Sequence, residues 1–413
     1  MKLNRVVVTG YGLTSPIGNT PEEFWNSLVN GKIGIGPITK FDNSDFAVHN
    51  AAEVQDFPFD KYFIKKDTNR FDNYSLYALY AAQEAVNNAK LDVESINHDR
   101  FGVIVSSGIG GLPTMEQQII KMHDKGPTRV APLFVPMTIG NMIAGNISMK
   151  TGARGICTSI VTACASGTHA IGEAFRNIKH GYSDVILAGG SEATICEIGI
   201  AGFAALTALS NSKDPNKASI PFDKNRNGFV MGEGAGIVVL ESLEHAQKRG
   251  ATIYAEIVGY GATADAYHMT APTPDGSGAG KAILQALNEA QLSPSDVDYI
   301  NAHGTSTPAN DSSEVTAIRY ALKEAADNVH VSSTKSMTGH LLGAAGAIEA
   351  IASIKVVGED FIPPTINVKE QDEACSVNVT ALTGVAKEVN VAISNSLGFG
   401  GHNAVLCFKK WKG

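Results

Sequence analysis

Short apolar runs rich in β-branched residues recur along the chain, and several of them close on glycine or serine. Short runs that are apolar at nearly every position are typical of strands buried on both faces of a sheet. They predict strands at residues 5–9, 103–105, 185–187, 236–240, 253–258, 297–300, 329–331 and 404–408.

Amphipathic segments lie between these runs. Apolar residues from 170 to 178 fall at three- and four-residue spacing, which predicts one face of a helix. Residues 76–89 and 348–354 show the same spacing. Strands that alternate with helices predict an α/β fold whose sheets are mostly buried.

The pattern also contains an internal similarity. Residues 231–240 resemble residues 400–406, since both are glycine-rich turns that follow a Gly-Phe pair and lead into an apolar strand. Residues 5–12 (RVVVTGYG) resemble residues 255–261 (AEIVGYG). The similarity predicts two halves of comparable plan, residues 1–252 and 253–413, packed as one rigid body. Chance similarity among glycine-rich strand ends is the alternative.

Composition and charge narrow the functional classes. The 413 residues are 44% hydrophobic and 18% charged, which is ordinary for a globular chain with a large core. The net charge of −8 disfavours nucleic acid as a partner. The five cysteines contain no C-x-x-C pair, which argues against a disulfide framework and a zinc site.

No run approaches the roughly 20 apolar residues of a membrane span, and the first residues contain no signal-peptide apolar region. We expect a soluble, cytoplasmic protein.

The segment around Cys164 combines an apolar run, a tight turn and a helix. Residues 156–161 predict a strand, TACASGT (162–168) predicts the turn, and the amphipathic helix follows at once. A cysteine at a helix N-terminus lies near exposed N–H groups and the positive end of the helix dipole, which both favour the reactive thiolate. The same N–H groups can stabilise the oxyanion formed when sulfur attacks a thioester.

The alternative for Cys164 is a buried structural cysteine. That interpretation is the better one for the other four cysteines, which lie in apolar strands or loops: Cys157, Cys196, Cys375 and Cys407.

Two histidines follow predicted strands among glycine and small polar residues. His303 lies in NAHGTST and His340 ends KSMTGH, which begins with Lys335. Because active sites of open α/β sheets gather at strand ends, both histidines are candidates. Glu349 follows on the next predicted helix.

A Cys–His–His set suits thioester chemistry better than metal binding, because no ligand spacing supports a metal site. The cysteine can accept an acyl group. Two neutral imidazoles can then donate hydrogen bonds to a second thioester carbonyl and stabilise the enolate left when carbon dioxide leaves a malonyl group. Lys335 adds positive charge or orders one histidine, and Glu349 holds Lys335 or a water.

Seven long motifs together resemble the β-ketoacyl-acyl carrier protein synthases of the thiolase superfamily, most closely the elongating members of dissociated bacterial fatty acid synthesis. The resemblance covers essentially the whole chain. The motifs are VTGYGLTSPIGN (8–19), TACASG (162–167), PFDKNRNGFVMGEGAG (221–236), NAHGTSTPAND (301–311), KSMTGHLLGAAGAIE (335–349), PPTIN (363–367) and NSLGFGGHNA (395–404).

The resemblance implies a duplicated, five-layered αβαβα thiolase-like fold and a homodimer. It also implies an acyltransferase reaction, a decarboxylating Claisen condensation. An acyl group moves from acyl carrier protein to Cys164. Malonyl carrier protein is then decarboxylated with the help of His303 and His340, and the resulting carbanion attacks the acyl-cysteine. Lys335 matches the essential lysine of the family.

Further positions take roles from the same resemblance. Thr305 and Thr307 match residues that contact the pantetheine arm, and Ile109 and Phe203 match positions that line the acyl pocket near the dimer interface. Phe399 matches a gating residue whose N–H shares the oxyanion hole with Cys164. Glu349 and Gly400 have supporting roles. No cofactor is implied, because the substrates carry phosphopantetheine on the carrier protein. Some relatives hold a structural monovalent cation, but we expect no metal here.

Two features depart from the family pattern. His402 stands where many relatives have threonine, and we expect it to tune the site. The basic positions for docking an acidic carrier protein match only loosely, and a solvated surface charge is the alternative for each candidate. The candidates are Lys65, Lys66, Arg70, Lys125 and Arg129.

The motifs weigh against most rival functions. A coenzyme A-dependent thiolase would need a second cysteine in the C-terminal turn, which reads GFGGHNA. An initiating synthase of the Cys–His–Asn type would not carry KSMTGH, and a catalytically silent partner subunit would lack the nucleophile. A ketosynthase of a polyketide pathway would carry the same catalytic set and stays open as the alternative.

Overall fold

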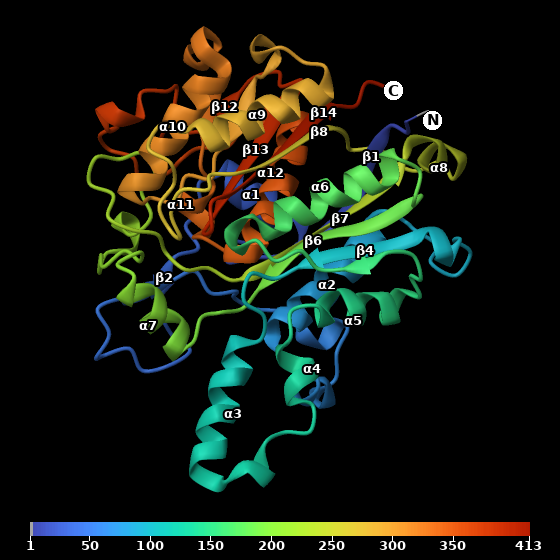
Figure 1. The fold of residues 1–413 in the computed structure, drawn as a ribbon, viewed down its shortest axis with the longest axis vertical. Helices are drawn as coiled ribbons and strands as arrows, with labels where there is room; N and C mark the ends of the chain where they lie inside the picture. Colours follow the sequence, from blue (N-terminus) through green and yellow to red (C-terminus); the bar gives the residue numbers. More distant parts are fainter. Residues whose placement is uncertain (1–2) are drawn as a thin grey trace.

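The computed structural model describes residues 3–413, and its largest sheet has ten strands in the order β10-β9-β13-β14-β8-β1-β7-β6-β4-β5 (Figure 1). The strands of this sheet are β1 (Val6–Thr14), β4 (Phe101–Ser106), β5 (Cys157–Thr158), β6 (Val185–Glu192), β7 (Gly234–Ser242), β8 (Ala255–Ala264), β9 (Tyr299–Asn301), β10 (His330–Ser332), β13 (Val391–Gly398) and β14 (His402–Lys410). Two small two-stranded sheets pair β2 (Gly36–Pro37) with β3 (Asn50–Ala51) and β11 (Phe361–Ile362) with β12 (Val385–Ala386).

The helices fill the segments between these strands. They are α1 (Pro21–Val29), α2 (Asn73–Asn88), α3 (Leu112–Lys125), α4 (Phe134–Thr138), α5 (Met142–Thr151), α6 (Ser166–Lys179), α7 (Glu197–Ala205), α8 (Leu243–Lys248), α9 (Ser277–Ala290), α10 (Pro308–Leu322), α11 (Lys335–Thr338) and α12 (Ala345–Glu359).

The ten-stranded sheet repeats one arrangement of five strands. From its middle outward, β1-β7-β6-β4-β5 and β8-β14-β13-β9-β10 both run through two antiparallel pairings and then two parallel ones. The two sets meet where Val6–Val8 of β1 pair antiparallel with β8. This repeat supports the predicted division at residue 252, which stays a prediction.

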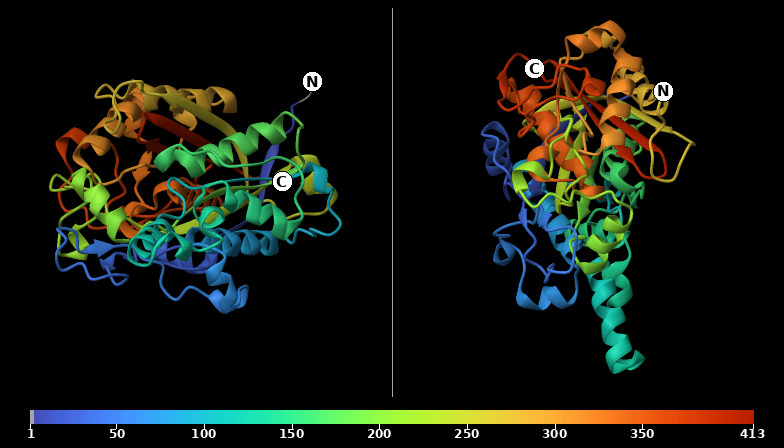
Figure 2. Two further views of the ribbon diagram at one scale, coloured as in Figure 1. Left: turned by 60° about the horizontal axis from the view of Figure 1, so that its bottom comes forward. Right: turned by 90° about the vertical axis from the view of Figure 1, so that its left-hand side faces the viewer.

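Helices separate the two sets of strands and cover their outer faces, as predicted for a layered α/β fold. The buried helices α6 and α12 pack against each other and against strands of both sets, and their side chains join one core. Helices α2 and α5 cover the outer face of the first set, and α9 and α10 cover that of the second (Figures 1 and 2). Because α12 is enclosed on nearly every side, its apolar sequence has no polar face.

Two elements differ from the sequence expectation. Residues 156–161 form only the two-residue strand β5 at the sheet edge, because the chain then turns into the cysteine segment. Strand β13, which the apolar pattern did not indicate, lies near the centre of the second set. Its sequence VAISNSLG mixes buried apolar and buried polar residues, so it lacks a continuous apolar run.

One helical arm extends away from the layered body. Helix α3 forms this arm and α4 lies beside it (Figures 1 and 2). No helix within residues 3–413 has both the length and the apolar character needed to cross a membrane.

Candidate active site

Cys164 lies in a short 3₁₀ turn, Ala163–Ala165, immediately before α6. The preceding Ala163 has a φ of +50°, an uncommon left-handed conformation that bends the chain sharply. The Ser166 hydroxyl braces the bend, because it accepts from the Thr162 N–H at 2.9 Å and donates to the Ala163 carbonyl at 2.7 Å. Cys164 is therefore fixed at the N-terminal end of a buried helix and is only 8% exposed.

The sequence leaves the protonation state of Cys164 open, and the structure shows which effects decide it. The pKa of the Cys164 thiol is raised to about 12, chiefly by burial and in smaller part by the nearby Glu192. Lys335 and backbone N–H groups lower that pKa, and the positive end of α6 acts in the same direction. Because desolvation is the larger effect, the resting group is the thiol, and its proton must leave as the sulfur attacks.

Two backbone N–H groups close to the Cys164 sulfur lower the pKa of the thiol, that of Phe399 and that of Cys164 itself. Phe399 is held in the turn between β13 and β14, where Gly400 and Gly401 have φ values of +89° and +75°. Residues with a Cβ are strained at such angles, so the turn depends on glycine. The Gly400 N–H also donates to the Met269 carbonyl at 2.7 Å, which joins the turn to the loop that follows β8.

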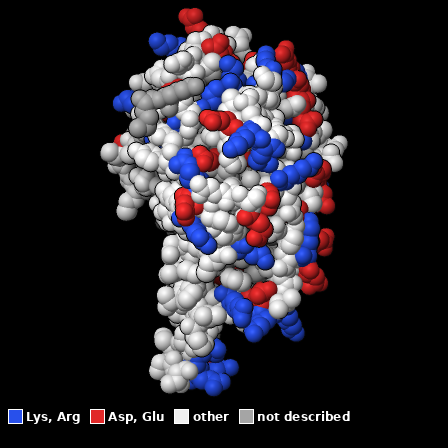
Figure 3. Space-filling model, turned by 90° about the vertical axis from the view of Figure 1, so that its right-hand side faces the viewer, with Lys and Arg blue, Asp and Glu red and all other residues white. Residues whose placement is uncertain are grey.

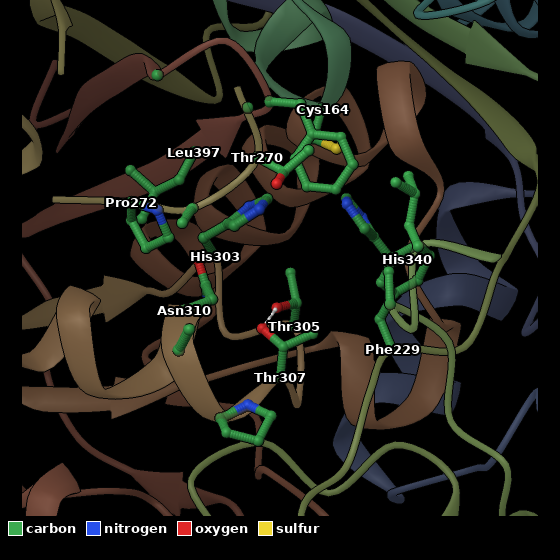
Figure 4. Close-up of a pocket in the computed structure, with 18 of the residues that line it drawn as sticks. Cys164, Phe229, Thr270, Pro272, His303, Thr305, Thr307, Asn310, His340 and Leu397 are labelled. Carbon is green, nitrogen blue, oxygen red and sulfur yellow. Dashed lines mark hydrogen bonds between the residues drawn. The ribbon is translucent and has the colours of Figure 1, made fainter. Parts of the chain in front are cut away.

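His303 and His340 face the same space from opposite sides. Their rings lie 5.2 Å apart between centroids and are nearly perpendicular, at 87°. In Figure 4 the two imidazoles point toward Cys164. Burial and the positive charge of Lys335 hold the pKa of each imidazole well below its usual 6.5, so both rings are neutral at physiological pH.

The buried Nδ1 atoms of His303 and His340 have no hydrogen-bond partner among residues 3–413. A proton at Nδ1 would leave a buried donor unsatisfied, so each proton belongs on Nε2, where it is available to the cavity. Glu314 positions the His303 segment, because its carboxylate accepts from the N–H groups of His303 and Gly304 at 2.8 and 2.7 Å. The Phe229 ring packs edge-on against His340 at 5.1 Å.

Lys335 forms a fully buried ion pair with Glu349 behind the two histidines. Burial raises the pKa of Glu349 to about 7, although Lys335 holds it down. The pair keeps a positive charge close to Cys164 and both imidazoles without placing it in the cavity.

Replacing Lys335 with methionine should destabilise the protein in a pH-dependent way. Without the cation, the pKa of Glu349 rises further above its ordinary 4.5. A carboxyl with a higher pKa in the folded than in the unfolded chain binds more protons when folded, so stability falls as pH rises. We expect a loss of about 3 kcal/mol in unfolding free energy at pH 8 and a smaller loss at pH 6, measured by urea denaturation. In the double variant K335M/E349Q the loss of unfolding free energy should be nearly the same at pH 6 and pH 8. An equal loss at both pH values in K335M itself would contradict the expectation.

Cys164 and the two histidines line a cavity of about 340 Å³. Predicted residues on its wall are Cys164, Phe203, His303, Thr305, Thr307, His340 and Phe399. Lys335 and Glu349 lie behind the wall, Ile109 packs in the apolar cluster beside Cys164, and Gly400 shapes the turn without lining the cavity.

At the end of the cavity away from Cys164, the hydroxyls of Thr305 and Thr307 lie 3.0 Å apart (Figure 4). Sequence reasoning missed several other lining residues, among them Phe229, Asp265, Thr270, Pro272, Asn310, Leu397 and Asn403. Asp265, Thr270 and Pro272 belong to the long loop after β8, whose polar sequence gave no signal. Phe229 lies in the motif at 221–236 and Asn310 in the motif at 301–311. Neither side chain is a nucleophile, acid or base, so residue type alone did not indicate it.

Comparisons with known proteins agree with this geometry. The family model of the β-ketoacyl synthase N-terminal domain matches residues 3–246, and that of the C-terminal domain matches residues 254–369. The chain is 51% identical over 413 residues to the 3-oxoacyl-[acyl-carrier-protein] synthase 2 of Synechocystis sp., covering 100% of this chain and 99% of that protein. It is 50% identical over 408 residues to the protein of the same name from Staphylococcus aureus, covering 99% of each.

Solved structures of ketosynthases share the fold. A β-ketoacyl synthase from Burkholderia phymatum superposes with a TM-score of 0.92 at 34% identity, over 99% of this chain and 100% of that one. A type II polyketide ketosynthase, solved in complex with its acyl carrier protein, gives 0.92 at 36% identity with the same coverage. The expected thiolase-like fold and the resemblance stated from the motifs are both confirmed.

Proposed function

The chain belongs to the β-ketoacyl synthase family, and we propose from this premise that it is the elongating condensing enzyme of dissociated fatty acid synthesis. The observation that carries the proposal is the convergence of three side chains, Cys164, His303 and His340, on one cavity. The names of the relatives at 50 and 51% identity support the choice of pathway.

The first half-reaction transfers an acyl group to Cys164. The sulfur attacks the thioester carbonyl of acyl carrier protein, and the N–H groups of Cys164 and Phe399 stabilise the oxyanion. When the intermediate collapses, the carbon–sulfur bond to the carrier breaks, and the proton of the thiol ends on the departing carrier thiol. Deep burial keeps water from hydrolysing the acyl-enzyme.

The second half-reaction forms the carbon–carbon bond. The thioester oxygen of malonyl carrier protein accepts hydrogen bonds from Nε2–H of His303 and His340, so the enolate is stabilised as carbon dioxide leaves. The enolate carbon attacks the acyl carbonyl on Cys164. The bond to sulfur then breaks, the thiolate takes up one proton, and 3-oxoacyl carrier protein leaves. The reaction needs no cofactor of the enzyme's own.

Substrate groups can be assigned to the two sides of Cys164. The hydroxyls of Thr305 and Thr307 suit the amide groups of a pantetheine arm, which we propose enters beside them. On the other side of the sulfur an apolar cluster suits the acyl chain, with Ile109 and Phe203 partly buried against it. Phe399 lines the cavity near Phe203, and we propose that its ring separates the two sides.

An acidic carrier protein needs a local basic surface on a chain of net charge −8. The five candidate docking residues are all exposed: Lys65, Lys66, Arg70, Lys125 and Arg129. The first three lie in or beside the 3₁₀ turn Lys65–Asn69, and the other two lie at the end of α3 and in the turn after it. Figure 3 shows Lys and Arg side chains over much of one face, including the lower part of the molecule. We propose this surface as the docking site.

We also propose that two copies of the chain associate through the helical arm. Exposed apolar side chains gather on α3, on α4 with its two end residues, and beside the edge strand β5, which is unusual for a monomer. They are Ile119, Ile120, Met122, Leu133, Val135, Ile139, Ile156 and Val161. Placing the enzyme in the cytoplasm agrees with five free cysteines among the described residues.

Replacing Val135 with aspartate should weaken the dimer. The side chain is 57% exposed in the single chain, so the change should leave the fold intact while burying a charge at the interface. Light scattering after gel filtration should give twice the chain mass for the wild type and a lower mass for V135D. Leu382→Asp, at a position that is also 57% exposed but in the C-terminal half, is the matched control. A wild-type mass of one chain would contradict the proposal.

Although the sequence led us to expect no metal, we propose that buried oxygens around Glu349, the partner of Lys335, hold a monovalent cation of the kind that some family members hold. Asn301 Oδ1, Ser394 Oγ and Glu349 Oε2 are buried without a partner among residues 3–413. Asn301 and Ser394 are register partners in β9 and β13, and α12, which carries Glu349, packs on β13. Oxygen donors of this kind suit a hard cation, which would neutralise the carboxylate and brace the strand ends.

Potassium should therefore stabilise the protein more than a cation too large for the site. We expect a higher Tm in potassium chloride than in tetramethylammonium chloride at the same ionic strength, because only the folded chain binds the ion. The variant Ser394→Ala should reduce the difference. Equal Tm values in the two salts would argue against a bound cation.

The proposed function is tested by product analysis. Purified protein with acyl and malonyl carrier proteins should release one carbon dioxide for each 3-oxoacyl carrier protein formed. A ketosynthase of a polyketide pathway would extend its product repeatedly without reduction, so chains lengthened by several units would favour that alternative. Absence of any condensation product would contradict both.

A further inference from the structure

Glu192 is a buried carboxylate close to Cys164 that the mechanism above does not use. It ends β6 and is 0% exposed. Its two oxygens accept four hydrogen bonds, from Ser107 Oγ at 2.7 Å and from the N–H groups of Gly108, Gly343 and Ile109 at 2.9, 3.0 and 3.3 Å. Every donor belongs to a segment outside β6.

The carboxylate joins segments that are far apart in the sequence. Residues 107–109 follow β4, and Gly343 lies in the turn between His340 and α12. A Cβ at Gly108 would lie 2.7 Å from Glu192 Oε2 and 3.4 Å from the carbonyl of Ala163, the residue before Cys164. A Cβ at Gly343 would lie 2.9 Å from the same carboxylate oxygen. The backbones therefore close around Glu192 and leave no space for another side chain.

The segments that Glu192 holds form the acyl side of the site. Ile109 is partly buried against the apolar cluster that contains Cys164, so its backbone position sets one side of that cluster. Gly343 lies three residues after His340, so the same carboxylate also supports the segment that carries this histidine. The negative charge is close enough to Cys164 to oppose ionisation of the thiol.

We propose that Glu192 is a positioning residue that holds the wall at Ile109 and the turn at Gly343 against Cys164, and thereby controls which acyl chains reach the sulfur. This proposal rests on the proposed function for the identity of the acyl donor. The hydrogen bonds of Glu192 are observed independently of that function. Burial raises the pKa of Glu192 to about 7, and the four donors act against this rise, as expected for a carboxylate that is used as an acceptor.

Two substitutions of Glu192 test separately the effect of its hydrogen-bond geometry and the effect of its negative charge. In Glu192→Gln one oxygen becomes an amide NH₂, which cannot accept, so some of the four donors lose their acceptor and the negative charge is lost. In Glu192→Asp the charge stays, but the side chain is one methylene too short to reach all four donors. The matched control is Glu241→Gln. Glu241 is also 0% exposed, but its register partner in β6 is Val185, at the opposite end of the strand from Glu192.

The first readout is acyl loading of Cys164 from six-carbon and sixteen-carbon acyl carrier proteins. We expect both Glu192 variants to load the long chain between about tenfold and a hundredfold more slowly, with a smaller effect on the short chain, and E241Q to match the wild type. Unchanged loading of both lengths in E192D and E192Q would overturn the proposal. If E192Q does not fold, E192D decides alone.

The second readout needs no carrier protein. Cys164 is alkylated with iodoacetamide and with an iodoacetamide that carries a ten-carbon chain, and adducts are counted by mass spectrometry. E192Q should react faster than the wild type with iodoacetamide at pH 7, whereas E192D should not, and both should discriminate more strongly against the long reagent. Equal slowing with both reagents in both variants would show a merely structural role and overturn the proposal. If the wild type fails to load from carrier proteins, the proposed function fails, and this readout still tests Glu192.

Discussion

Replacing Cys164 with alanine is expected to remove acyl loading entirely and to slow condensation by at least about 10⁴-fold, because no other group near the oxyanion donors can carry the acyl chain. The two histidines and Lys335 do not depend on the sulfur for their positions. The variant should therefore keep decarboxylating malonyl carrier protein, releasing carbon dioxide without a condensation product.

This result is measured by following carbon dioxide and 3-oxoacyl carrier protein in parallel. Cys157→Ala is the control, since Cys157 does not line the cavity and the variant should load as the wild type does. An acyl adduct that persists in C164A would place the nucleophile elsewhere. Loss of decarboxylation together with condensation would mean that the sulfur also takes part in removing carbon dioxide.

Replacing His303 or His340 with alanine is expected to slow decarboxylation by about 10²–10⁴-fold while acyl loading of Cys164 changes by only a few fold. Each variant removes one of the two N–H donors to the enolate oxygen. In the proposed mechanism the acyl oxyanion accepts from the backbone N–H groups of Phe399 and Cys164, which neither substitution removes. Single-turnover loading and carbon dioxide release measure the two steps separately.

The histidines also define a pH dependence. Because the pKa of both imidazoles lies well below 6.5, decarboxylation should stay constant from pH 6.5 to 8 and should fall only at lower pH, where protonation becomes possible. His123→Ala, at a surface position whose side chain is 87% exposed, is the control. Loss of acyl loading in both active-site variants would refute the proposed division of the two steps.

Much of this site could be predicted from the sequence because its chemistry is local. Cys164 lies between a turn and an amphipathic helix, and both histidines follow short strands, so residue type and neighbourhood indicated the nucleophile and its partners. The internal repeat could also be predicted. Strand β1 resembles β8 in sequence, and β7 resembles β14, and these strands take equivalent places in the two sets of the sheet.

The remaining features depend on contacts between distant segments. The protonation state of Cys164 could not be decided from its helix alone, because the burial that opposes ionisation comes from residues far apart in the chain, such as Ile38, Ile195 and Leu342. Glu192 gave no signal, because its four donors lie 83 to 151 residues away. Strand β13 was missed because its polar residues are buried by hydrogen bonds and packing rather than by apolarity.

The central claim is that Cys164 carries the acyl group to a malonyl-derived enolate. Intact-protein mass spectrometry tests it most directly, with wild type and C164A first incubated with acyl carrier protein and then with malonyl carrier protein. We predict that only the wild type gains the mass of one acyl group, and that malonyl carrier protein then discharges it as a 3-oxoacyl product two carbons longer. An adduct that malonyl carrier protein cannot discharge, or no adduct at all, would contradict the account.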